Sequence, residues 1–163
     1  IAGFSADGTD HVGINFGGYI WQDTGVALQP NTTYTLSLAA GNRGGQSNAA
    51  NATTYSILAG ATNLGVANYA TAADVVADNA LTLATQTVNA TTLTAAGSFA
   101  EAPPLVFTTG ASVPAQNVVI FLGADGLGRS HFDNIRLDAS PIPEVSTSLL
   151  GALAGLVLLR RRR

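Results

Sequence analysis

Short stretches in which apolar and polar residues alternate recur along most of this chain. The clearest covers 33–40, where Tyr34, Leu36 and Leu38 fall on one side of an extended strand while threonine and serine fall on the other. A period of two predicts a strand with one buried face. Weaker alternation predicts further strands over 12–16, 19–24, 53–59, 81–88, 91–94, 105–108 and 131–139.

Two further features complete the expected architecture. The run 118–122 is almost wholly apolar, which predicts a central strand covered on both faces. The stretch 16–19 contains two adjacent glycines and predicts a hairpin turn between the first two strands. Short strands, separated by turns about every ten residues and with little helix, predict an all-β fold, a jelly-roll β-sandwich over residues 1–139.

The pattern changes at residue 140. A short segment with proline and glutamate leads into an apolar run over 149–159, and four arginines follow it. Such a run partitions into hydrocarbon, and the arginines stay with anionic head groups on the cytoplasmic side. It is shorter than the roughly 20 residues of a relaxed transmembrane helix. A short membrane anchor and a sorting signal both stay open, whereas a buried core helix would not normally end in four arginines.

The order of these parts resembles the PEP-CTERM sorting signal of Gram-negative and related bacteria, with valine at the third motif position where that family has proline. The resemblance implies a short hydrophobic C-terminal helix within residues 140–163, an exosortase as partner, and transient anchoring in the inner membrane before release to the cell surface or extracellular matrix. The residues that it implies are the sorting motif Pro143, Glu144 and Val145, the membrane anchor Leu149, Leu150, Leu153, Leu156, Val157, Leu158 and Leu159, and the cytoplasmic stop Arg160, Arg161, Arg162 and Arg163.

Charge and composition narrow the expectations for the body of the chain. All seven basic residues are arginines and four belong to the tail, which leaves three arginines against ten acidic residues in residues 1–159. This acidic balance argues against a nucleic-acid partner. The chain has no cysteine, which excludes disulfides, thiolate metal ligands and a cysteine nucleophile. It begins at Ile1 without a basic and apolar leader, so we expect a body that is incomplete at its N-terminus.

Two stretches of the body resemble galactose-binding-like sandwiches of secreted bacterial proteins. One combines 18–22 with 28–37, and the other, His-Phe-Asp-Asn-Ile-Arg-Leu, covers 131–137. The resemblance implies binding of carbohydrate or exopolysaccharide, and it implies Asp133 as a ligand of a structural calcium ion. Calcium takes six to eight oxygen ligands, so one carboxylate would need partners. The alternative is that Asp133 hydrogen-bonds neighbouring backbone at the start of the strand.

Sugar binding requires an aromatic platform with polar groups beside it. Trp21 and Tyr19 alternate on one strand, and Arg43 lies in the loop after the clearest strand, so these three are the candidate ligand residues. The alternative for the two aromatic residues is one face of the hydrophobic core.

No catalytic residues are predicted. His11 and His131 are the only histidines, and nothing in their spacing places either beside an activated serine. The predicted function is therefore an exported, non-enzymatic surface or matrix protein that binds polysaccharide. The alternative is a purely structural or adhesive sandwich with no small-molecule ligand.

Overall fold

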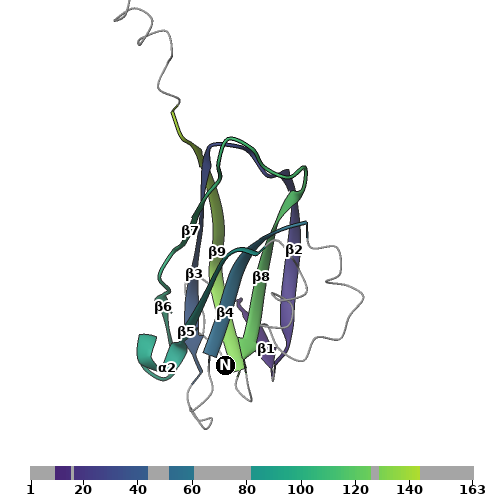
Figure 1. Ribbon diagram of the computed structural model, residues 1–163. Helices are drawn as coiled ribbons and strands as arrows, with labels where there is room; N and C mark the ends of the chain where they lie inside the picture. Colours follow the sequence, from purple (N-terminus) through teal and green to yellow (C-terminus); the bar gives the residue numbers. More distant parts are fainter. Residues whose placement is uncertain (1–9, 16, 44–51, 61–81, 126–128, 144–163) are drawn as a thin grey trace, which may run out of the picture.

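Two antiparallel β-sheets packed face to face form the body of the protein (Figure 1). The computed structural model describes residues 10–15, 17–43, 52–60, 82–125 and 129–143. Almost all regular structure in this part of the chain is strand, which confirms the predicted all-β class. The strands that face each other bury apolar side chains between the two sheets.

The first sheet is built around the pairing of two long strands. Its order is β1-β9-β3-β6, and β7 pairs with the part of β3 that β6 leaves open. Its strands are β1 (Val12–Asn15), β9 (Arg129–Pro141), β3 (Thr32–Asn42), β6 (Ser98–Glu101) and β7 (Leu105–Thr108).

The second sheet has the order β2-β8-β4-β5, so β8 is a central strand. This confirms the prediction made from the apolar run 118–122. Its strands are β2 (Tyr19–Ala27), β8 (Asn117–Asp125), β4 (Ala52–Ala59) and β5 (Thr82–Asn89).

The predicted hairpin over 16–19 is wrong. β1 and β2 belong to different sheets, so the turn between them carries the chain across the sandwich instead of pairing the two strands. The Gly18 amide donates to the Asn15 carbonyl oxygen at 2.9 Å. A Cβ atom on Gly18 would lie 2.8 Å from that oxygen, so only glycine fits this crossing.

The predicted strand over 91–94 is also wrong, because a short helix, α2 (Ala90–Leu93), occupies this position. Asn89 precedes it with extended backbone, and its side chain accepts a hydrogen bond from the Thr91 amide at 2.9 Å. This N-cap satisfies an amide that the first turn would otherwise leave unpaired, and it outweighs the weak strand preference of threonine.

The core lies where the alternation of 33–40 predicted it. Tyr34, Leu36 and Leu38 are all at most 1% exposed, and they pack with inward residues of β4 and β8. The two buried tyrosines keep their hydroxyl groups bonded. The Tyr34 hydroxyl accepts from the Gln29 amide at 2.8 Å, and the Tyr55 hydroxyl donates to the Pro103 carbonyl at 2.6 Å.

The predicted sorting and anchor segment falls largely outside the described residues. Pro143 is the last described position, and the remaining predicted residues, 144–145, 149–150, 153 and 156–163, lie beyond it. Among the described residues, no helix has the length and apolar character needed to cross a membrane.

The core assignment predicts a large loss of stability on truncation of Leu36. Leu36→Ala removes a fully buried side chain, so the free energy of unfolding should fall by about 2–5 kcal/mol. The matched control is Val106→Ala, since Val106 is 54% exposed on β7, the strand that pairs with β3 at Leu36. Its effect should stay within about 0.5 kcal/mol. Urea unfolding of the three proteins makes the comparison, and equal losses in both variants would contradict this core assignment.

Candidate ligand-binding cavity

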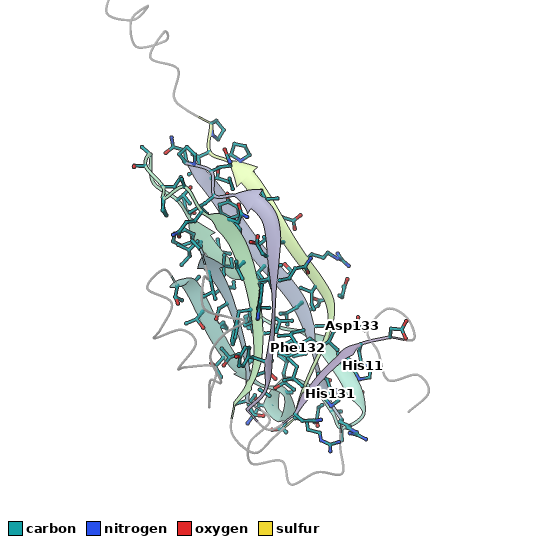
Figure 2. All side chains as sticks on the ribbon, turned by 90° about the vertical axis from the view of Figure 1, so that its right-hand side faces the viewer. His11, His131, Phe132 and Asp133 are labelled. Carbon is teal, nitrogen blue, oxygen red and sulfur yellow. The ribbon has the colours of Figure 1, made fainter. Side chains whose placement is uncertain are left out.

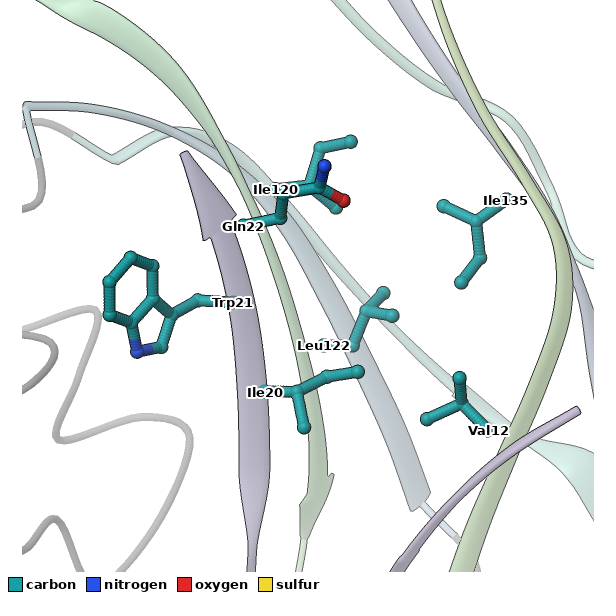
Figure 3. Close-up of a pocket in the computed structure, with 7 residues that line it drawn as sticks. All are labelled: Val12, Ile20, Trp21, Gln22, Ile120, Leu122 and Ile135. Atoms are coloured by element: carbon teal, nitrogen blue, oxygen red, sulfur yellow. The ribbon is translucent and has the colours of Figure 1, made fainter. Parts of the chain in front are cut away.

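An apolar cavity of about 250 Å³ lies between the two sheets, at the side of the sandwich where β1 and β2 form the edges. Figure 3 shows side chains from both sheets converging on it. The lining residues are Val12, Ile20, Trp21, Gln22, Ile120, Leu122 and Ile135.

The second sheet supplies one wall through strand register. Ile20 pairs with Leu122 and Gln22 pairs with Ile120, so alternate residues of β2 and β8 face the cavity together. Leu122 is 3% exposed at the floor, whereas Ile20 is 40% exposed at the mouth. The solvent exposure of this wall therefore increases from the central strand β8 to the edge strand β2.

The first sheet supplies the opposite wall through a β-bulge in β9. Ser37 pairs with Arg136 and Ala39 pairs with Asp133, so two residues of β9 lie opposite the single residue Leu38. One of the two, Asn134, has a φ of 52°. The extra residue changes the alternation, and both Phe132 and Ile135 consequently face the interior although they are three positions apart.

The described residues that line the cavity are uncharged and almost wholly aliphatic on the side that faces it. Trp21 contributes little to it, because its ring points to the other side of β2 (Figure 3). Among the described residues, this leaves the Gln22 carboxamide as the polar side chain of the lining. Such a surface suits an apolar, neutral small molecule and gives a charged one no compensation for lost hydration.

The three predicted sugar ligands are not brought together by the cavity. Tyr19 stacks on Phe121 with ring centroids 5.5 Å apart, on the face of the second sheet that also carries the 43% exposed Trp21. Arg43 follows β3 in the first sheet. Tyr19 and Trp21 therefore belong to an outer face of the sandwich, and Arg43 to the end of the opposite sheet.

A cluster of rings lies on the outer face of the first sheet (Figure 2). The His11 ring centroid is 5.1 Å from that of His131 and 5.7 Å from that of Phe99. Gly13 on β1 lies beside the His131 imidazole, and a Cβ atom added there would be 3.4 Å from that ring. Gly41 on β3 instead leaves room for the Phe99 ring, which would lie 2.6 Å from an added Cβ atom. Burial, followed by the charges of His11, Arg43 and Arg129, lowers the pKa of His131 to about 4.

Asp133 shares this outer face with His131 and is 8% exposed. Its Oδ1 accepts a hydrogen bond from the Asn134 amide at 2.7 Å, which is the backbone role that the sequence left open as the alternative to calcium. Within the described part of the chain, no group of three or more histidines and carboxylates could hold a metal ion. The described side chains around Asp133 therefore supply no such cluster, and we derive no step through calcium.

Sequence reasoning did not single out the cavity residues. Ile20, Ile120, Leu122 and Ile135 occupy ordinary inward positions of strands, where an aliphatic side chain normally denotes core. The signal that separates them is spatial: they lie at the edge of the sandwich, where none of the described strands closes the gap between the sheets.

Comparison with known proteins gives a family match and a fold match. The family model described as HpiC1 cyclase (HpiC1-like) matches residues 3–138. Among solved structures, the Stig cyclase Fisc from Fischerella sp. TAU in complex with (3Z)-3-(1-methyl-2-pyrrolidinylidene)-3H-indole is 22% identical, with a TM-score of 0.58, over 84% of this chain and 67% of that one. A cyclase from Fischerella sp. TAU in complex with 4-(1H-indol-3-yl)butan-2-one is 23% identical, with a TM-score of 0.59, over the same shares of the two chains.

The apo form of a cyclase from Fischerella sp. is 24% identical with a TM-score of 0.59, over 84% of this chain and 65% of that one. The chain thus spans about two thirds of the length of these proteins, and at these identities the likeness is one of fold. A comparison with curated proteins gave no significant match.

These findings overturn the predicted family and function. The assignment to PEP-CTERM sorted proteins with a galactose-binding-like body was wrong, as were the exosortase and polysaccharide partners, the surface-protein role and the absence of catalysis. The matched family is a cyclase family, and the match covers nearly the whole sandwich. The prediction gave most weight to the tail after residue 140, which lies outside the matched residues.

The lowered pKa of His131 predicts a stability that depends on pH. Between pH 6.5 and about 4 the unfolded chain binds a proton at this residue and the native protein does not, so stability is full above pH 6.5 and decreases as the pH falls toward 4. The contribution of His131 to this loss should be about 1–3 kcal/mol. The measurement is urea unfolding at pH 7.0, 5.5 and 4.5.

The control for this prediction is His131→Asn, which cannot titrate. Other groups contribute equally to both proteins, so the difference between them isolates His131. The stability of the variant should fall less than that of the unaltered protein between pH 7.0 and 4.5. Parallel pH profiles would contradict the assignment of the pKa shift to burial of His131.

Proposed function

This chain belongs to the HpiC1-like cyclase family, and we propose that it is an enzyme that cyclises a small apolar molecule bound in the cavity between its two sheets. The observation that carries the proposal is the cavity itself, an open hollow between the two sheets whose described lining is uncharged and mainly aliphatic. The predicted polysaccharide would require polar groups along an exposed platform, and this lining does not provide them.

The size of the cavity limits what it can hold. Small-molecule sites usually measure about 300–1,000 Å³, so a volume of about 250 Å³ is just below that range. It suits one fused aromatic ring system, with the rest of the ligand extending past Ile20 toward solvent. Two of the similar cyclase structures hold indole compounds, and this supports an indole-bearing substrate for this chain.

The lining supports ring closure through binding and shape. A cyclisation joins two parts of one molecule, and holding these parts in contact removes much of the entropic barrier. Leu122 and Ile120 on one wall and Val12 and Ile135 on the other restrict a bound chain to folded conformations. Their apolar surfaces also keep water away from an electron-poor centre that forms during the reaction. We assign these four side chains the roles of binding and folding the substrate.

The finer features of the fold belong to the same proposal. The sheet orders β1-β9-β3-β6 and β2-β8-β4-β5 support a jelly roll if β6 and β7 are counted as one interrupted strand. The division of the chain into residues 1–139 and 140–163 stays a prediction, with β9 ending at Pro141. Export of the protein and calcium at Asp133 also stay predictions.

Filling the cavity should abolish binding of the substrate class. Val12→Phe places a larger side chain on the β1 wall, and we expect the affinity for 4-(1H-indol-3-yl)butan-2-one to fall at least tenfold as judged by isothermal titration calorimetry, because the ring would occupy the ligand's space. Val106→Phe is the matched control, since it adds the same volume at an exposed position of β7 outside the cavity.

Turnover completes this test. The unaltered protein should convert an alkenyl indole substrate into a cyclised isomer of unchanged mass, which chromatography and NMR detect. Val12→Phe should lose this conversion, whereas Val106→Phe should keep it. Equal affinity and turnover in the two variants would contradict the cavity as the site. Folding of both variants is verified by thermal unfolding before the comparison.

A further inference from the structure

We infer that Gln22 is the specificity-determining residue of the cavity: its carboxamide binds the one polar group of a neutral aromatic substrate and thereby selects and orients it. This inference rests on the proposed function, and it adds the class of substrate that the site accepts. The structural basis is the contrast, among the described lining residues, between the Gln22 carboxamide and the aliphatic side chains that face the cavity with it.

The position of Gln22 places its amide at the mouth of the cavity. Gln22 lies on the edge strand β2 opposite Ile120 of β8, and both side chains extend to the cavity side of the sheet (Figure 3). Gln22 is exposed, so its amide lies where the aliphatic wall meets solvent. A ligand ring held between Leu122 and Ile135 would meet this amide with its outer edge.

The nearest charge on the same strand is turned away and engaged elsewhere. Asp23 follows Gln22 and therefore faces the opposite side of β2. Its Oδ1 accepts from the Gly25 amide at 2.8 Å, and its Oδ2 accepts from the Asn117 side-chain amide at 3.3 Å. The carboxylate thus has its own partners, and the polar recognition at the mouth is left to the neutral Gln22.

The chemistry of a primary amide defines the substrate class. The Gln22 carbonyl oxygen can accept from a ring N–H group, and its NH₂ group can donate to a carbonyl or ring nitrogen. A single hydrogen bond to this amide does not compensate for the lost hydration of a full charge, and the aliphatic walls offer no hydrogen bonds. A carboxylate, ammonium or diphosphate group would therefore lose its hydration without replacement. The accepted substrates are therefore neutral aromatic molecules with one hydrogen-bonding group at the ring edge.

Two probes of the same shape test this inference. Indole carries a ring N–H group, and 1-benzothiophene has nearly the same bicyclic shape without a donor. The unaltered protein should bind indole about three to ten times more tightly than benzothiophene, as measured by NMR titration, because one exposed hydrogen bond contributes about this factor. Gln22→Leu should remove this preference and keep the affinity for benzothiophene within about twofold.

The control variant is Gln29→Leu, which replaces a second exposed glutamine that lies outside the cavity lining. It should keep the preference for indole. If both probes bind and Gln22→Leu still prefers indole to the original extent, the inference about Gln22 is overturned while the cavity proposal stands. If neither probe binds the unaltered protein, the cavity proposal is overturned and this inference with it.

Discussion

The pairing of β3 with β9 is the constraint on which the rest of the structure depends. It runs from Thr32 opposite Pro141 to Gly41 opposite His131 and joins segments about a hundred residues apart in the chain. Its register decides which side chains of β9 face the interior. The bulge opposite Leu38 interrupts that register once, and the interruption separates the interior residue Phe132 from the cavity residue Ile135.

This one strand also keeps two different environments apart. On its inner face, Ile135 forms part of an uncharged wall that a small apolar molecule can fill. On its outer face, His131 and Asp133 are nearly buried among polar and ring groups, and burial holds His131 in its neutral form at physiological pH. A slip of one residue would exchange the two faces and place an imidazole and a carboxylate in the aliphatic interior. The difference between the two faces of this strand therefore follows from its register.

Local pattern predicted the elements that depend on alternation alone, and it failed where a neighbour or a cap decides the outcome. Tyr34, Leu36 and Leu38 show their buried face in sequence because the period of two is undisturbed. The crossing from one sheet to the other after Asn15 could not be predicted in this way. A hairpin turn and a crossing between sheets both require glycine, so the glycines there do not distinguish the two. The candidate site escaped prediction for a related reason: an aliphatic residue beside a cavity has the same local sequence as one in a filled core. The tail, in contrast, has a conspicuous pattern, and the family assignment made from it was wrong for the chain as a whole.

The placement of the cavity follows from how a sandwich ends. In the interior of each sheet a neighbouring strand lies on both sides, but β1 and β2 have one partner each, β9 and β8. Consecutive strands that lie on opposite sheets at the same edge leave a gap, and within the described part of the chain the side chains of the cavity-lining strands border it. The side chains that line this gap are mainly valine, isoleucine and leucine. Branched side chains of this kind have few allowed rotamers, so they cannot extend across the gap and close it. A preformed apolar hollow is thus a consequence of the strand order and of side-chain shape, and a ligand that filled it would replace contacts that the protein cannot make by itself.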